Sequence, residues 1–244
     1  MIENSVFISG SISIKNLPLE VKQSIQKIIN HNMQILVGDA NGIDSLVQDY
    51  CLSLDYFNIT VYSISLLPRY RASDKFALKY IEVPNQIKAT RERQQHKDRA
   101  MTIDSQYSFV IWDGKSKGSY ANIIRALEHA KKIKLYRGNG FLKPNEINKE
   151  NIELIYRKNT GYTALEVVQQ LKNIFHKTQD LNRYLLQHSI IKKDNNVYQP
   201  MSKYENLFII SKYRGRVKGI KFRSEFLDWI KGNFSENHSL FIKN

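Results

Sequence analysis

The feature that most constrains the fold is an alternation of short apolar runs with amphipathic stretches over the first ~140 residues. The apolar runs predict buried strands at residues 5–9, 34–37, 58–64, 107–112 and 132–136. Stretches with helical spacing separate these runs. Because strands joined by helices pair in parallel and are covered on both faces, the pattern predicts a Rossmann-like open parallel sheet of the α/β class.

The connecting helices are expected at residues 19–29, 43–54 and 86–101, with a fourth marked by the apolar positions of 123–130. Cys51 falls on the apolar face of the second helix and is expected in the core. It is the only cysteine, so no intrachain disulfide forms, which fits a reducing, cytoplasmic location. No apolar run approaches the ~20 residues that cross a bilayer, so no membrane contact is expected.

The pattern changes at a turn-rich segment, residues 137–145, and we expect a first domain at 1–140 and a second at 150–244. The second domain is predicted to contain helices at 163–175, 178–188 and 224–230, a hairpin at 192–198, and a basic, strand-like stretch at 212–222. Thr163 and Glu166 form a candidate capping box at the start of the first helix. Helix, turn, helix and then strands is the order of a small α+β winged helix-turn-helix domain.

Charge is the first indication of a partner. The chain has 37 Lys and Arg against 23 Asp and Glu, a net charge of +14. From residue 151 onward there are 16 against 8, so the surplus is denser in the shorter second domain. Such a balance favours nucleic acid, anionic nucleotides or an acidic surface as a partner, and the alternative is a solvated basic surface without a specific ligand.

Three glycine-containing loops follow predicted strands, at residues 10–11, 38–42 and 113–119. In an open parallel sheet, ligands bind in the crevice at the carboxyl ends of the strands, where helix N-termini offer free N–H groups to anions. The third loop adds Lys115 and Lys117, which can neutralise a phosphate. The alternative is that the glycines only make tight strand-to-helix turns.

These three loops carry a resemblance. Residues 7–11 (Phe-Ile-Ser-Gly-Ser), 38–44 (Gly-Asp-Ala-Asn-Gly-Ile-Asp) and 113–119 resemble the SLOG superfamily, which includes the DNA-processing protein A domain, the "Lonely Guy" phosphoribohydrolases and several nucleotide sensors. The resemblance covers residues 4–137 and implies a Rossmann-like domain that binds a nucleotide or nucleotide-derived ligand. The residues that it places at the ligand are Gly10, Ser11, Gly38, Asp39, Asn41, Gly42, Asp44, Arg99, Asp113, Gly114, Lys115, Ser116, Gly118, Ser119 and Asn122.

The sequence departs from the phosphoribohydrolase pattern, a Pro-Gly-Gly-x-Gly-Thr-x-x-Glu loop with an upstream Arg. Here Gly118 and Ser119 match Gly-Thr, but Asn122 stands at the Glu position, and an amide cannot act as a general base. Residues 96–99 resemble the upstream segment, which makes Arg99 a candidate phosphate or ribose contact; the alternative is a surface salt bridge. Catalysis stays open, with Arg99, Asp98 and Asp113 as candidate catalytic residues and Asp39 and Asp44 as further carboxylates.

The second domain resembles the winged-helix domain at the C-terminus of phage antirepressors, on residues 162–166, 178–188 and 214–229. This resemblance implies binding of DNA or of a protein partner. Polar residues of the second helix could reach base edges, and basic residues of the hairpins could contact phosphates. These candidates are Gln179, Asn182, Arg183, Gln187, Lys192, Lys193, Arg214, Arg216, Lys218 and Lys221. The alternative is a helical module with a solvated basic face.

The favoured interpretation is a nucleotide-sensing protein whose second domain binds DNA or a partner, in a phage, mobile-element or defence context. The chain is expected to form a homodimer or higher oligomer. A second interpretation is an enzyme that cleaves the N-glycosidic bond of a nucleotide, and a third is a single-stranded-DNA-processing protein. No metal-ligand spacing stands out among the six histidines, and no cofactor is required.

Overall fold

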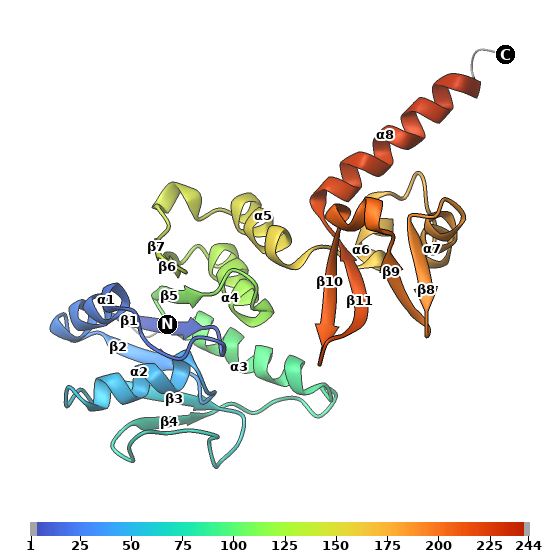
Figure 1. The fold of residues 1–244 in the computed structure, drawn as a ribbon. Coiled ribbons are helices and arrows are strands. Elements are labelled where there is room, and N and C mark those ends of the chain that lie inside the picture. The colour runs from blue at the N-terminus through green and yellow to red at the C-terminus, as the bar shows by residue number, and fades with distance from the viewer. Residues whose placement is uncertain (1–3, 242–244) are drawn as a thin grey trace. The chain divides into compact units, whose positions relative to one another are not determined.

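The computed structural model describes residues 4–241 and divides the chain into two compact units, Met1–Glu153 and Leu154–Asn244. The first unit is a seven-stranded sheet with helices on both faces (Figure 1). In sheet order, its strands are β4 (Ala77–Tyr80), β3 (Ile59–Ser63), β2 (Gln34–Val37), β1 (Ser5–Gly10), β5 (Tyr107–Trp112), β6 (Lys132–Arg137) and β7 (Gly140–Phe141). All neighbours pair in parallel except β6 and β7. The predicted Rossmann-like open parallel sheet is confirmed.

The helices of this unit divide between the two faces of the sheet because successive strand residues point to opposite sides. Val6 and Ile8 of β1 belong to the core formed with α1 (Leu19–Asn30) and α2 (Ile43–Leu52). Phe7, between them, packs against Met101 of α3 (Thr90–Asp104) on the other face, where α3 contacts α4 (Lys117–Glu128). Cys51 is fully buried in the first core as predicted, and burial raises the pKa of its thiol to about 12.

Three elements were not predicted from the sequence. β4 is an edge strand whose side chains are largely exposed, so it shows no buried apolar run, and β7 is two residues long. The helix α5 (Lys149–Thr160) follows a 3-10 turn at Pro144–Glu146 and contains the boundary between the two units.

The second unit contains helices and two small antiparallel hairpins. Its elements are α6 (Ala164–Gln170), α7 (Thr178–Gln187), the hairpin of β8 (Ile191–Asp194) and β9 (Val197–Pro200), a 3-10 helix (Ser202–Leu207), the hairpin of β10 (Phe208–Tyr213) and β11 (Arg216–Phe222), and α8 (Ser224–Phe241). The first hairpin follows two helices as predicted, whereas the stretch predicted as strand-like at 212–222 forms the end of β10 and all of β11 of a second hairpin. Leu181, Leu185, Phe222 and Phe226 belong to their common core.

The capping box at α6 is confirmed, because the Thr163 hydroxyl accepts the Glu166 N–H and the Glu166 carboxylate accepts the Thr163 N–H. The helix itself ends at Gln170 rather than at the predicted residue 175. Beyond it, the N–H groups of Ile174 and Phe175 bond to the Leu171 carbonyl in successive turns. These turns keep Leu171 and Phe175 buried, so the apolar spacing continues past the end of the helix.

Candidate functional site

A cleft of about 550 Å³ opens at the carboxyl ends of β1 and β5. The chain runs from β1 to β2 on one side and returns to β5 on the other, so these two strands flank the point where the strand order reverses. Ligands of open α/β sheets bind at such a point because the loops on its two sides diverge. The cleft is lined by the end of β1, the loops that follow β1 and β2, one face of α3 and the first turn of α4.

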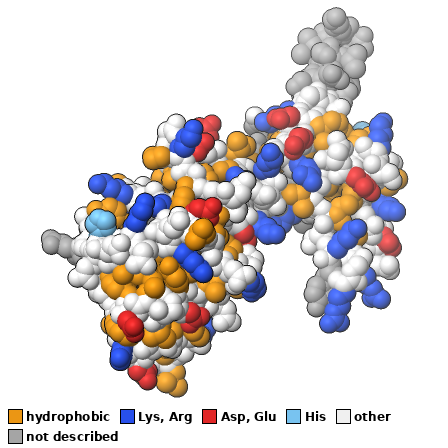
Figure 2. Space-filling model, turned by 60° about the vertical axis from the view of Figure 1, so that its left-hand side comes forward, with side chains coloured by type: hydrophobic (Ala, Val, Ile, Leu, Met, Phe, Trp, Pro, Cys, Tyr) orange, Lys and Arg blue, Asp and Glu red, His pale blue; other side chains and the backbone are white. Residues whose placement is uncertain are grey.

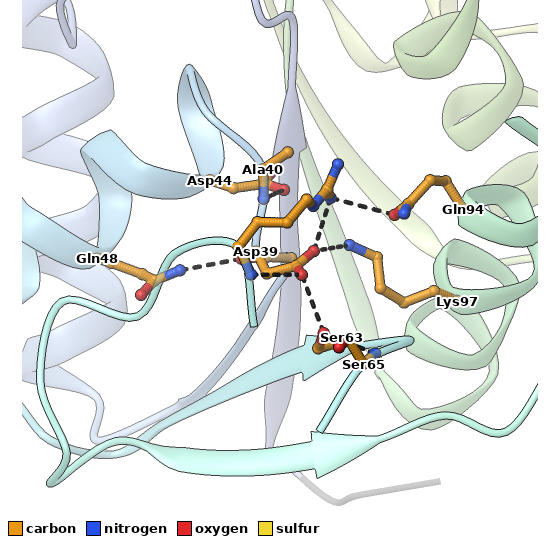
Figure 3. A network of polar contacts seen from close by, with 10 residues as sticks. Asp39, Ala40, Asp44, Gln48, Ser63, Ser65, Gln94 and Lys97 are labelled. Atoms are coloured by element: carbon orange, nitrogen blue, oxygen red, sulfur yellow. Dashed lines mark hydrogen bonds and ion pairs between the residues drawn. The ribbon is translucent and has the colours of Figure 1, made fainter. Parts of the chain in front are cut away.

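Beneath the cleft, Asp39 from the loop after β2 is the centre of a buried polar network (Figure 3). Its carboxylate accepts hydrogen bonds from Lys97 Nζ at 2.7 Å, Arg69 Nη2 at 2.7 Å and Ser63 Oγ at 2.9 Å. Burial alone would raise the pKa of Asp39, but Arg69 and Lys97 hold it well below its usual range. Asp39 is therefore an ionised internal group whose bonding capacity is used within the protein.

Two glycines of this loop are required by close contacts within the protein. A Cβ at Gly38 would lie 2.3 Å from Asp44 Oδ2 and 2.9 Å from Lys97 Nζ. Gly42 has a φ of +86°, and a Cβ there would lie 2.6 Å from Ile12 Cα. The absence of these side chains lets the polar network and the neighbouring loop pack closely, rather than letting the backbone approach a ligand.

Two carboxyl groups, Asp44 of α2 and Asp98 of α3, line the cleft itself. Burial raises the pKa of Asp44 to about 7; the charge of Lys97 opposes this shift, and the charges of Asp98 and Asp39 add to it. Burial also raises the pKa of Asp98, against the charges of Lys97 and Arg125 and a hydrogen bond from Asn122. The two carboxyl groups influence each other's titration, so the pair can hold a proton near neutral pH.

The loop after β5 is held together by Asp113. Its carboxylate accepts the Ser116 N–H at 2.7 Å, the Lys115 N–H at 3.0 Å and the Ser13 hydroxyl at 2.7 Å. Burial raises the pKa of Asp113, but these hydrogen bonds outweigh it and lower the pKa to about 2. Asp113 does not line the cleft and shapes the turn into α4.

The first turn of α4 faces the cleft. Ser116 is the N-cap residue, and its side chain makes no capping hydrogen bond. Lys117, Gly118 and Ser119 line the cleft, and a Cβ at Gly118 would meet nothing within 4 Å. The first backbone N–H groups of a helix have no partner within it and carry the positive end of its dipole. This turn therefore offers N–H groups and the Lys117 ammonium to an anion.

The floor of the cleft contains a buried hydroxyl without a partner. Ser9 is 3% exposed, and its Oγ makes no hydrogen bond within the part of the chain that the structure describes. It lies in β1 on the same face as Phe7, which brings it to the cleft beside α3. Unsatisfied buried polar groups are rare in proteins because each loses its hydrogen bonds to water.

The structure brings about half of the predicted ligand residues into the cleft. Those in the lining are Gly10, Ser11, Asp44, Ser116, Gly118, Ser119 and Asn122, together with the catalytic candidate Asp98. Those outside the lining are Gly38, Asp39, Asn41, Gly42, Arg99, Asp113, Gly114 and Lys115. Arg99 is an exposed residue of α3, and Lys97 approaches the site in its place.

Sequence reasoning missed several polar residues of the lining, namely Arg69, Thr90, Arg91, Gln94, Gln95 and Lys97. Most of them lie on α3, where positions 91, 94, 95 and 98 share one helical face, and this spacing was a usable signal. Arg69 had no such signal in the sequence, because it comes from the loop between β3 and β4 and reaches Asp39 from 30 residues away in the chain.

In the second unit, the nucleic-acid candidates lie on exposed surface, except that Asn182 is half-buried. Asn182 lines a cavity of about 370 Å³ with Thr178 of α7 and Lys218 of β11. Arg214 lies in the tight turn between β10 and β11, with Arg216 at the start of the next strand. Figure 2 shows Lys and Arg side chains at the ends of the hairpins of this unit.

Comparisons of this chain with protein-family models, with curated proteins and with solved structures find no match. The family resemblances of the two units therefore stay predictions. Among residues 4–241, no group of three or more His, Cys, Asp or Glu is placed to hold a metal ion. The described helices include none that is long and apolar enough to span a bilayer.

Proposed function

We propose that the first unit binds a nucleotide or nucleotide-derived ligand, as a member of the SLOG superfamily would. The observation that carries the proposal is the pairing, in one cleft, of the α4 N-terminus and Lys117 with the unpartnered Ser9 hydroxyl. A phosphate would accept hydrogen bonds from the backbone N–H groups of Lys117, Gly118 and Ser119. The Ser9 hydroxyl and the carboxyl groups of Asp44 and Asp98 would be left for the sugar or base.

Two lysines of the same loop make a matched test. Lys117 lines the cleft, whereas Lys115, two residues earlier, is exposed and lies outside the lining. We would screen the full chain by thermal shift against nucleoside monophosphates, dinucleotides and cyclic nucleotides. A ligand at 100 times its dissociation constant stabilises the folded state by about 2.7 kcal/mol, which gives a visible shift.

With the best ligand from this screen, Lys117→Ala should raise the dissociation constant about tenfold, while Lys115→Ala should leave it within about twofold. Ser9→Ala should weaken binding without lowering the melting temperature, because no protein hydrogen bond is lost. An equal effect of the two lysine variants, or no hit across the panel, would overturn the nucleotide proposal.

A second candidate function of this cleft is hydrolysis of an N-glycosidic bond, favoured by the two carboxyl groups with raised pKa values. One carboxyl group would protonate the leaving base as the C1′–N bond breaks. The other, ionised, would take a proton from the water that forms the new C1′–O bond. This arrangement does not need a carboxylate at position 122, where the sequence has Asn.

Release of free base, followed by chromatography, tests this second function. Asp44→Asn and Asp98→Asn should each lower turnover about 100-fold or more while the nucleotide still binds. Asp74→Asn is the control, because its carboxylate is exposed on the surface outside the lining and the variant should keep turnover unchanged. No base release from any bound nucleotide would leave this cleft a binding site.

We propose that the second unit binds DNA through α7 and its two hairpins, in the manner of a winged helix. Support comes from the exposed basic residues at the hairpin ends and from Asn182, Arg183 and Gln187 on one helix. Duplex binding should weaken with salt, and Arg216→Ala and Lys218→Ala should each reduce the salt slope by about one. Measuring this binding with and without the nucleotide tests whether the ligand regulates it.

A further inference from the structure

A second cavity, of about 440 Å³, lies in the first unit between α1 and the strands β1, β5 and β6. It belongs to the opposite face of the sheet from the cleft, since Val6 and Phe109 line it and both are in the core formed with α1 and α2. Its residues take no part in the proposed nucleotide site, because the two linings share none.

The walls of this cavity are apolar and partly aromatic. They are formed by Val6, Ile28, Met33, Tyr107 and Phe109. The parallel register sets Tyr107 beside Lys132 and Phe109 beside Lys134, so the two rings and the two lysine stems alternate on one face. A volume of this size is within the ~300–1,000 Å³ range of small-molecule sites.

The charges around the cavity are of one sign. Lys27 of α1 and Lys132 and Lys134 of β6 line it, together with His31, and no carboxylate of the described residues does. Lys134 Nζ donates a hydrogen bond to Ser24 Oγ at 2.8 Å and lies 4.4 Å from the centre of the Phe141 ring. Burial and the charge of Lys27 lower the pKa of Lys134, as expected for an ammonium group that has no carboxylate beside it among the described residues.

We propose that this cavity binds an amphiphilic anion: an apolar or aromatic body packed against Tyr107, Phe109 and Ile28, with a carboxylate or phosphate held by Lys27, Lys132 and Lys134. The three ammonium groups supply charge-assisted hydrogen bonds that a neutral ligand cannot use. The apolar walls exclude inorganic phosphate alone as the preferred occupant, because it would leave that surface without a partner.

A competing interpretation is that the lysine stems only cover the apolar face of the sheet while their ammonium groups remain in water. The two interpretations differ in what an anionic head contributes to binding. If the proposal is right, removing the positive charges weakens the binding of an anionic probe and leaves the binding of a neutral probe of similar shape unchanged. If the lysines only cover the sheet, replacing them changes the binding of the two probes to the same extent.

The test uses the full chain and two fluorescent probes, 1-anilinonaphthalene-8-sulfonate, which is anionic, and N-phenyl-1-naphthylamine, which has no sulfonate. Lys134→Met and Lys27→Met keep apolar stems and should each raise the dissociation constant of the sulfonate probe about tenfold, with the neutral probe changed less than twofold. Lys22→Met is the control on the same helix, since Lys22 lies outside the cavity. Lys117→Ala should also leave the sulfonate probe unaffected, which separates this site from the nucleotide cleft.

Displacement then identifies the head group. Decanoate carries a carboxylate and octyl phosphate a phosphate on a similar chain, and either one displacing the sulfonate probe supports the proposal. If neither displaces it, or if Lys134→Met and Lys27→Met bind it as tightly as the unaltered chain, the lysines only cover the sheet and the proposal is wrong.

Discussion

Two loops leave the same edge of the sheet, after β2 and after β5, and both are rich in glycine, aspartate and other polar residues. In the loop after β2, Asp39 is turned inward and is saturated by Lys97, Arg69 and Ser63. In the loop after β5, Asp113 accepts hydrogen bonds from its own loop and from Ser13 of the loop after β1, and the following helix turn is left facing the cleft. Similar sequence signals thus produce an internal scaffold in one loop and a binding surface in the other.

The difference follows from where the donors come from. Lys97 and Arg69 reach Asp39 from distant segments, so the first loop joins β2, α3 and the loop after β3 into one polar core. Two donors of Asp113, the N–H groups of Lys115 and Ser116, are only two and three residues away, so the loop after β5 is shaped mainly by local hydrogen bonds, with Ser13 as one distant donor. A locally satisfied loop leaves its helix N-terminus available to a ligand.

The strongest test of this comparison is Asp39→Asn. Loss of the carboxylate leaves the Lys97 ammonium, which is 2% exposed, without its charged partner. Removing one member of a buried ion pair costs about 3–5 kcal/mol. Urea unfolding should show this loss, whereas Asp113→Asn, whose carboxylate is partly exposed, should cost clearly less. If the two variants lost the same free energy of unfolding, the loop after β2 would be no more important to the stability of the protein than the loop after β5.

The pH dependence of stability should have opposite signs for Asp44 and Asp113. Folding raises the pKa of Asp44 from 3.8 to about 7, so the folded protein holds a proton that the unfolded chain has lost between those values. Its contribution therefore falls as pH rises through that window. Folding lowers the pKa of Asp113 from 3.8 to about 2, so its contribution is present above 3.8 and is lost as pH falls toward 2.

Urea unfolding at several pH values checks both signs. Asp44→Asn should improve stability more at about pH 8 than at about pH 5, and Asp113→Asn should cost more near neutral pH than at about pH 3. A pH-independent effect of Asp44→Asn would show that its carboxyl group is not held protonated.

Gly38→Ala and Gly118→Ala compare the space in the two loops. The first places a Cβ 2.3 Å from Asp44 Oδ2 and should cost about 1–3 kcal/mol through displaced side chains. The second adds a methyl group in open space at the start of a helix, where Ala is favoured over Gly by up to about 1 kcal/mol. Thermal melts should therefore move in opposite directions; a destabilised Gly118→Ala would contradict an open cleft at α4.

Ser11→Ala should have the smallest effect. The Ser11 hydroxyl accepts the Asp113 N–H at 3.1 Å and lies 3.2 Å from Ser119 Oγ, so it connects the loop after β1 to the loop after β5 and the start of α4. Its loss should cost about 1 kcal/mol. Ser13→Ala is the comparison, because it removes a donor to Asp113 on more exposed surface. A larger loss of stability in Ser13→Ala than in Ser11→Ala would mean that Ser13, rather than Ser11, is the main link between the two loops.

Most of the sheet could be predicted, and the parts that could not have definite reasons. Ile35, Leu36 and Val37 of β2 are all fully buried, so their run of apolar residues is visible in the sequence. Ala77–Tyr80 forms an edge strand with exposed side chains, which removes that signal. Arg99 was predicted at the site and Lys97 was not, because residues two apart on a helix face different sides and only the rotation of α3 decides which one turns inward.

The sequence by itself determined that strands and helices alternate, that the sheet is parallel, and that three polar loops gather at one edge. These follow from local periodicity, because burial on both faces requires continuous apolar runs in the strands. Only the tertiary structure decided which polar groups face the cleft and which lie beneath it. That choice depends on partners such as Lys97, 58 residues from Asp39, whose approach no local pattern records.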